Sequence, residues 1–434
     1  MKAKEKMVLL GIFLLFSSKS LISYSNQIVI NDETIDVSAP SGAGMSAGKD
    51  QTIINRGVIN VTGNKFTTGM KVDGAGREGI NEGVINHVGN GTDTSNAMNA
   101  QNGGYVENKK EISVSGKNAS GVSADKSGSK GINNGNINVS NSANGMKVTN
   151  GAEVINKGII DVGGAYSTGI LAIDSDSRAI NEGDIYVSGN SSVGISVTKG
   201  SYGENKGNIH VTAGQYTSGM KVDGVGSKGV NSGKIVHIGD GQTSNAMLGQ
   251  NGGSIENIGI IEVSGTNASG MSIDKAGTEL SNKGNIVVTN KAKGIKITGG
   301  AKGSNENQID VQDGTGISVE TGSEGLNNGN INVSGDSSTG LLVTDGRVVN
   351  NGNIIVTAGE FTSGIKAVGS KAQGINDGTI IHVGNGKTSN AMLAQSGGYI
   401  ENNNIIQVSG INVSGMAIDG KNSNGVNNKN IIGN

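Results

Sequence analysis

Short runs of alternating apolar and polar residues recur along the chain. In Asn205–Val222 (NKGNIHVTAGQYTSGMKV) an Asn-x-Gly turn leads into a run with Ile209 and Val211, and a Gly-rich corner leads into a second run with Met220 and Val222. Alternation with a period of two is the pattern of a strand with one buried face. Each unit therefore predicts two short strands, and a briefer apolar pair before the next asparagine predicts a third.

The unit repeats at a nearly constant spacing, which is marked by an asparagine before each turn. The spacing is about 25 residues, with steps of 22 to 27. A fixed period in this range is the signature of a solenoid. The marking asparagines are Asn31, Asn55, Asn81, Asn108, Asn133, Asn156, Asn181, Asn205, Asn231, Asn257, Asn282, Asn305, Asn327, Asn350, Asn376, Asn402 and Asn427.

Three strands in about 25 residues predict an all-β fold, a parallel β-helix solenoid of about 17 rungs. Neighbouring rungs would lie roughly 4.8 Å apart, which makes a rod on the order of 80 Å long. We expect the asparagines to stack as a structural amide ladder at one corner, and the glycine two residues after each to give the turn backbone freedom. Ile59, Val61, Met70 and Val72 are expected to point into the core of one rung.

The rungs themselves repeat along the sequence in groups of six. The order of rung lengths returns along the chain, and the segment TSNAM occurs once in each copy, which indicates duplication. The copies allow an internal comparison. We call them the first block, residues 55–204, the second block, 205–349, and the partial third block, 350–434.

Residues 1–25 have the features of a secretory signal peptide. Lys2, Lys4 and Lys6 precede the apolar run MVLLGIFLLF, and small residues follow it. That order of charge, apolar run and small residues is typical of export signals, and ten apolar residues are too few to span a bilayer. We therefore expect an exported mature chain, residues 26–434, that forms one β-helix domain and does not span a membrane.

Composition narrows the class of protein further. Glycine accounts for 75 of 434 residues, but a single proline and the lack of Gly-X-Y order exclude collagen. Aromatic residues make up 3% and tryptophan is absent, so the core must be a narrow stack of Ile, Val, Met and Ala. Without cysteine, an exported chain must be stabilised by stacking. A formal charge of −2 without a clustered basic face argues against nucleic-acid binding.

With an export leader, no cysteine and rungs of the INxGxIxVxGxxSxGMxV kind, residues 26–434 resemble the passenger of a type V autotransporter, especially large fusobacterial-type adhesins. The resemblance implies a right-handed β-helix displayed outside the outer membrane. It also implies adhesion to a protein or glycan on a host or neighbouring cell. Such passengers are usually followed by a C-terminal translocator barrel. The alternating segments of a barrel are missing before Asn434, so we expect a truncated passenger with uncertain attachment to the outer membrane.

Three histidines occupy the same place in successive blocks, where most rungs have an inward valine. They are His87, His237 and His382, and each is followed by an apolar residue. We expect a β-bulge that turns the histidine outward and returns the next residue to the core. Six rungs separate them, on the order of 30 Å, so they cannot share one metal ion. We expect no metal and no cofactor.

Acidic groups are too scattered to predict an active site. Asp174 and Asp176 form a rare pair, and Asp73 and Asp223 give way to Val368 in the third block. β-Helix enzymes that cleave polysaccharides need clustered acids. We therefore expect no catalytic residue. A carbohydrate-active enzyme on the same fold remains one alternative, and a non-binding structural spacer remains another.

The few aromatic residues are the most informative candidates for a binding site. Phe66, Tyr216 and Phe361 are equivalent in the three blocks, and Tyr166 sits similarly, all in the turn before the second strand. One interpretation is a ring packed over a corner, and the other is a stacking platform for sugars or for a partner's side chains. On the second interpretation the chain is a secreted or surface-displayed rod that adheres through repeated weak contacts.

Overall fold

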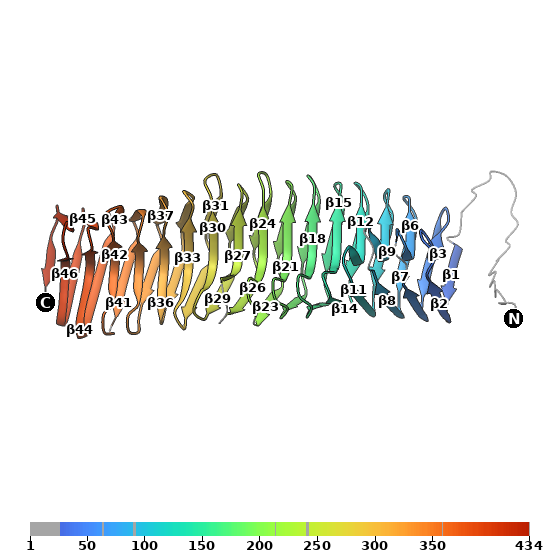
Figure 1. Cartoon of the computed structure of the whole chain (residues 1–434), viewed down its shortest axis with the longest axis horizontal. Coiled ribbons are helices and arrows are strands. Elements are labelled where there is room, and N and C mark those ends of the chain that lie inside the picture. The colour runs from blue at the N-terminus through green and yellow to red at the C-terminus, as the bar shows by residue number, and fades with distance from the viewer. Residues whose placement is uncertain are drawn as a thin grey trace, which may run out of the picture.

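The computed structural model describes residues 27–433 apart from 63–64, 90–92, 213, 240–242 and 358. The predicted signal peptide, residues 1–25, lies outside the described residues. The described part is a rod in which strands stack along the long axis from β1 (Gln27–Asn31) at one end to β48 (Ile431–Gly433) at the other (Figure 1).

The described residues form 48 strands and no helix, and therefore contain no helix that could cross a membrane. Each rung has a first, a second and a third strand, and these pair in parallel with their equivalents in the neighbouring rungs. The result is an all-β parallel solenoid of about 16 turns with about 25 residues per turn, which confirms the predicted fold class.

The third strands, each of which ends in a ladder asparagine, form a 17-stranded sheet. They are β1 (Gln27–Asn31), β4 (Gln51–Asn55), β7 (Glu78–Asn81), β10 (Tyr105–Asn108), β13 (Lys130–Asn133), β16 (Glu153–Asn156), β19 (Arg178–Asn181), β22 (Tyr202–Asn205), β25 (Lys228–Asn231), β28 (Ser254–Asn257), β31 (Glu279–Asn282), β34 (Lys302–Asn305), β37 (Ser323–Asn327), β40 (Gly346–Asn350), β43 (Ala372–Asn376), β45 (Tyr399–Asn402) and β47 (Asn424–Asn427).

The first and second strands together form a 31-stranded sheet, because two long strands near the C-terminal end run through the corner and join the two faces. The long strands are β44 (Thr379–Gln395) and β46 (Ile406–Asp419). The other first strands are β2 (Thr34–Val37), β5 (Val58–Val61), β8 (Val84–Val88), β11 (Glu111–Ser115), β14 (Asn136–Ser140), β17 (Ile159–Val162), β20 (Asp184–Val187), β23 (Asn208–Thr212), β26 (Lys234–Ile238), β29 (Ile260–Ser264), β32 (Asn285–Thr289), β35 (Gln308–Val311), β38 (Asn330–Val333), β41 (Asn353–Thr357) and β48 (Ile431–Gly433).

The second strands face the first strands across the core. They are β3 (Ala43–Ala47), β6 (Thr68–Asp73), β9 (Ser95–Gln101), β12 (Ala119–Asp125), β15 (Asn144–Thr149), β18 (Thr168–Ile173), β21 (Val193–Thr198), β24 (Ser218–Asp223), β27 (Ser244–Gln250), β30 (Ala268–Asp274), β33 (Ala292–Thr298), β36 (Gly314–Val319), β39 (Thr339–Val343) and β42 (Ser363–Val368).

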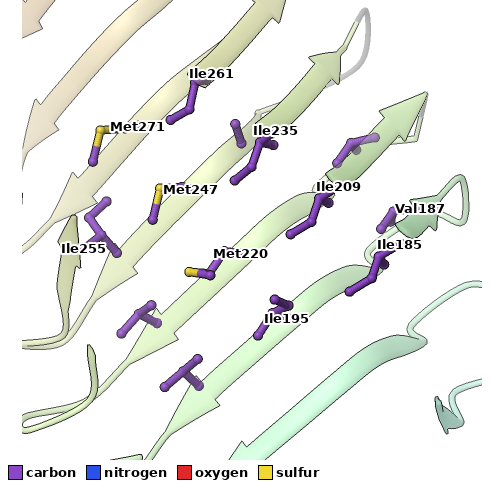
Figure 2. Close-up of a cluster of buried hydrophobic side chains, with 14 of the residues drawn as sticks. Ile185, Val187, Ile195, Ile209, Met220, Ile235, Met247, Ile255, Ile261 and Met271 are labelled. Atoms are coloured by element: carbon purple, nitrogen blue, oxygen red, sulfur yellow. The ribbon is translucent and has the colours of Figure 1, made fainter. Parts of the chain in front are cut away.

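The core is a set of columns in which like residues stack from rung to rung. Ile209 lies level with Ile235 in the first strands, and Met220 with Met247 in the second strands. Figure 2 shows these columns continuing through the neighbouring rungs. All four side chains are fully buried, as are the inward residues predicted for the earlier rung. Burying one such side chain stabilises the fold by roughly 1.5–3 kcal/mol, so every rung adds the same increment.

The ladder asparagines form an unbroken chain of side-chain amide bonds from Asn31 to Asn427. Each Nδ2 donates to the Oδ1 of the asparagine in the next rung, at 2.7–2.9 Å. The ladder from Asn55 to Asn402 is fully buried. Because a buried amide without partners costs about 1–3 kcal/mol, each asparagine depends on its neighbours. The role of these residues is structural.

The glycine after the ladder asparagine is required for space rather than for backbone freedom. At Gly207, a Cβ atom would overlap the carbonyl oxygen of Gly183 in the preceding rung, and Gly83 meets Gly57 in the same way. Neither glycine has a positive φ. The backbone freedom expected of these two glycines is therefore not used for a left-handed conformation. Where two glycines stack in successive turns, a side chain on either would need the backbone to shift, whereas Lys110 and Asn307 show that other rungs accommodate one at this position.

Candidate ligand-binding surface

The three equivalent histidines point into the core. His87 lies level with Val61 in the preceding rung and with Val114 in the following rung. His237 and His382 occupy the same valine column in their blocks. All three are at most 1% exposed. The prediction that a β-bulge turns these side chains outward is wrong.

The residues that follow the histidines are the exposed ones. Val88 is 48% exposed, Ile238 51% and Val383 42%. The first strand β8 pairs with β11 through Val88 without a shift in register, so no bulge is present there.

Two of the three core histidines are hydrogen-bonded to a serine, whereas neither ring nitrogen of His382 has a hydrogen-bond partner. Nε2 of His87 lies 2.9 Å from Oγ of Ser95, and Nε2 of His237 lies 2.9 Å from Oγ of Ser244. Burial lowers the pKa of His87, His237 and His382 to about 4, because a charged imidazole would lose its hydration. Such groups are uncharged near neutral pH, and their burial keeps them from any external ligand.

Four aromatic residues in the turn before the second strand are exposed. Phe66 is 59% exposed, Tyr166 71%, Tyr216 55% and Phe361 56%. The residues therefore present most of their surface to solvent rather than packing over the corner. The sequence alone is compatible with both arrangements.

The backbone at these four positions is left-handed, with φ between 50° and 59°. Aromatic residues are uncommon in this region, whereas asparagine tolerates it well. An aromatic residue is therefore a poor choice for the turn itself, and its exposure means that burial does not compensate. In other rungs the same place, also with positive φ, holds Ser41, Asn118, Ser142, Ser191, Asn267, Lys291, Ser337 and Asn412.

A groove of about 460 Å³ lies beside Phe66 on the outward face of the second strands. Its floor is a column of outward residues from four adjacent rungs, namely Lys71, Asn99, Ser123 and Lys147. These residues come from β6, β9, β12 and β15, which bring together parts of the chain about 75 residues apart. The sequence patterns alone do not identify these four residues. The one signal in the sequence is that the asparagine of the first block is replaced by leucine in the later blocks.

The side chains of this floor have no partners within the described residues. None of the four forms a side-chain hydrogen bond or an ion pair with a described residue. Asn99 and Ser123 are only 7% and 6% exposed. Burial lowers the pKa of Lys147, against the opposing effect of Asp125 and Asp174. The groove therefore presents polar groups that are partly desolvated and unpaired.

A second groove, of about 490 Å³, crosses the outward face of the third strands. Several of its charged groups form ion pairs. Glu256 lies 2.6 Å from Lys283 and 3.0 Å from Lys228, and both lysines lower the pKa of Glu256. Lys302 lies 2.6 Å from Glu324. Because these groups already satisfy each other, this groove has less capacity to attract a charged or polar ligand.

Tyr105 and Tyr399, which begin the equivalent third strands β10 and β45, bond within their own strands. Tyr105 donates its hydroxyl to Glu107 at 3.2 Å, and Tyr399 donates to Glu401 at 2.9 Å. Burial, together with the negative charge of Glu107, raises the pKa of Tyr105 to about 12. These hydroxyl groups remain protonated and engaged, which is consistent with a structural role.

Clustered acids and metal ligands are not found in the part of the chain that the structure describes. No group of three or more His, Cys, Asp or Glu side chains there could hold a metal ion. Asp174 and Asp176 both lie in one turn with positive φ, at 72° and 64°. The groove beside Phe66 and the exposed rings therefore make up the candidate ligand-binding surface.

Comparison with known proteins identifies the family of the chain. The family model described as BigA third pectate lyase-like domain matches residues 17–111 and 166–367. Searches of curated proteins and of solved structures returned no match. The two matched segments together make up more than half of the chain and span most of the first two blocks. The protein therefore belongs to the BigA third pectate lyase-like domain family.

Proposed function

We propose that this protein is a secreted or surface-displayed β-helical rod that adheres to a protein or glycan on another cell. The observation that carries the proposal is the set of exposed rings at Phe66, Tyr166, Tyr216 and Phe361, which the turn backbone disfavours. The β-helix fold and the BigA-type family are compatible with a rod at the cell surface. An exposed ring gives a large, rigid contact area for a sugar face or an apolar side chain.

The positions of the rings favour binding by several weak contacts at once. All four occupy the same turn, so they lie along one edge of the rod. Counted in rungs of roughly 4.8 Å, Phe66 and Tyr166 are separated by about 19 Å, Tyr166 and Tyr216 by about 10 Å, and Tyr216 and Phe361 by about 29 Å. Weak contacts that are linked in this way raise the overall affinity far above that of one contact.

The test replaces all four rings by asparagine, which the left-handed turn accepts. Attachment of fluorescently labelled protein to cultured epithelial cells should fall at least tenfold in the quadruple variant and less than threefold in each single variant. Val225, which is 83% exposed and lies in a different turn, supplies the control Val225→Asn. Equal attachment by the quadruple variant, with an unchanged circular dichroism spectrum, would exclude the rings as the adhesive surface.

A carbohydrate-active enzyme is the second candidate, and the family description, which contains the term pectate lyase, favours it. Such a lyase would release unsaturated sugars from a polyuronate chain. The test incubates the protein with polygalacturonate and follows the ultraviolet absorbance of the unsaturated product. We expect no release above a heat-treated control, because clustered acids are not found among the described residues.

A further inference from the structure

The outward polar groups in the floor of the groove beside Phe66 lack side-chain partners among the described residues. On the first strands, some outward polar residues bond across rungs, as Asn86 does to Asn60 at 2.9 Å. In the groove floor, Lys71, Asn99 and Lys147 have no such partner in the described residues. Polar groups that are removed from water without partners carry a free-energy cost, which a bound ligand can offset.

The charge of the groove favours an anionic group on the ligand. Lys71 and Lys147 mark the two ends of the floor, three rungs or about 14 Å apart. The carboxylate in the lining, Asp125, already accepts hydrogen bonds from Thr149 at 2.8 Å and from Asn150 at 2.7 Å. Lys71 and Lys147 form no ion pair with a described residue, although Asp125 and Asp174 attract Lys147, which is partly desolvated.

The remaining groups of the groove suit a sugar. Asn99 and Ser123 provide an amide and a hydroxyl between the lysines, which can bond to sugar hydroxyl groups. Phe66 lines the groove at one end with more than half of its surface exposed, so that a sugar ring can stack on it. A groove several rungs long can contact several linked sugar units at once.

The second block contains the same strands but not the same groove floor. Leu248 replaces the amide of Asn99 between β24 and β30. Lys296, the equivalent of Lys147, lies 3.8 Å from Glu320 and so has an anionic partner within the chain. The second block therefore keeps the ring of Tyr216 but offers a floor that is less polar and in which Lys296 is already paired.

From these contacts we propose that the groove beside Phe66 is a binding site for an oligosaccharide that carries carboxylate or sulfate groups. Phe66 stacks on a sugar ring, Asn99 and Ser123 bond to its hydroxyl groups, and Lys71 and Lys147 bind its anionic groups. This inference rests on the proposed adhesive function, because both use one of the exposed rings. It adds the class of ligand and restricts the specific site to the first block.

The experiment titrates the whole protein with three tetrasaccharides by isothermal calorimetry. Hyaluronan tetrasaccharide carries carboxylates, heparin tetrasaccharide carries sulfates as well, and chitotetraose is neutral. We expect at least one of the two anionic probes to bind with a stoichiometry of one, at least tenfold more tightly than chitotetraose. The hyaluronan and heparin titrations distinguish carboxylate from sulfate recognition. Equal binding of all three probes, or of none, overturns the proposal.

Matched variants distinguish the groove from general attraction to the lysines of the surface. Phe66→Asn and Lys147→Met should each weaken binding of the anionic probe about tenfold, whereas the equivalents Tyr216→Asn and Lys296→Met should change it less than twofold. Equal losses in both blocks would refute a specific groove.

Loss of cell attachment in the four-ring variant, without any oligosaccharide binding, would refute this inference alone. Oligosaccharide binding by a protein whose attachment is insensitive to the rings would refute the proposed function alone.

Discussion

The first and second blocks have the same interior and different outward surfaces. Met70 and Met220 are equivalent and fully buried, and both blocks carry an inward histidine and an unbroken ladder. On the outward face, Asn99 in the first block corresponds to Leu248 in the second. Inward residues must match the rungs above and below, so duplication preserves them. Outward residues are free to diverge, and it is there that two copies of one fold can acquire different ligands.

The largest expected effect comes from breaking the asparagine ladder at equivalent sites in the two blocks. Asn81→Leu and Asn231→Leu each remove an amide that donates to the next rung, at 2.8 and 2.7 Å. The neighbouring amides are then buried without partners, at about 1–3 kcal/mol for each group. We expect both variants to lose about 3–5 kcal/mol of stability, measured by urea unfolding followed by circular dichroism.

The control for the ladder variants is Asn86→Leu, which removes an exposed amide bond of similar length. It should cost less than about 1 kcal/mol, because water replaces the lost partner. A loss in one block that exceeds the loss in the other by several kcal/mol would contradict the equivalence of the two interiors.

The next effect concerns the buried histidines and depends on pH. Their folded-state pKa of about 4 lies below the value of 6.5 for an unfolded chain, so the unfolded state binds more protons. Stability should therefore be lost as the pH falls from about 6.5 to about 4, by up to about 3 kcal/mol for each histidine. The variant with His87→Val, His237→Val and His382→Val should keep its stability over that range.

The measurement compares urea midpoints at neutral and acidic pH for the parent protein and for the three single valine variants. Each single variant should remove a similar share of the pH dependence, because the three sites have the same burial and the same inward column. If the triple variant loses as much stability in acid as the parent, other groups dominate the acid sensitivity.

A smaller effect is expected when the groove is transferred to the second block. This experiment tests directly which residues make the two outward surfaces differ. Leu248→Asn restores the amide of the floor, and Glu320→Gln removes the anionic partner of Lys296. The double variant should bind two molecules of the anionic tetrasaccharide instead of one, with affinities that agree within about 1.4 kcal/mol, or tenfold. Calorimetric stoichiometry measures this. A value that stays at one would show that these two positions do not account for the difference between the blocks.

The smallest expected effect is a gain in stability when a ring is removed. Phe66→Asn and Tyr216→Asn place a residue suited to left-handed backbone at φ of 50° and 59°. We expect each to raise the free energy of unfolding by about 0.5–1 kcal/mol, as measured by thermal unfolding. Ser191→Asn, in the same turn without a ring, should change it less. A clear loss of stability in the ring variants would mean that the rings support the turn.

Much of the fold could be predicted from the sequence because each rung repeats the same local choices. Alternation placed Ile209 and Met220 in the core, and the constant spacing of asparagines indicated stacked corners. The prediction for His87 was wrong because a polar residue in an apolar column suggested a bulge. At His87 the buried imidazole replaces a valine, and its Nε2 reaches a serine in the next strand. That partner lies across a turn whose path alternation does not predict.

The sequence by itself determined the rung, the direction of its inward residues and the stacking corner, since these follow from a period of two within strands and of about 25 between them. Only the tertiary structure decided that Lys71, Asn99 and Lys147 form one column beside Phe66. Turn lengths differ from rung to rung, so sequence spacing does not show which outward residues align. Parallel pairing between strands sets that register, and with it the surface available to a ligand.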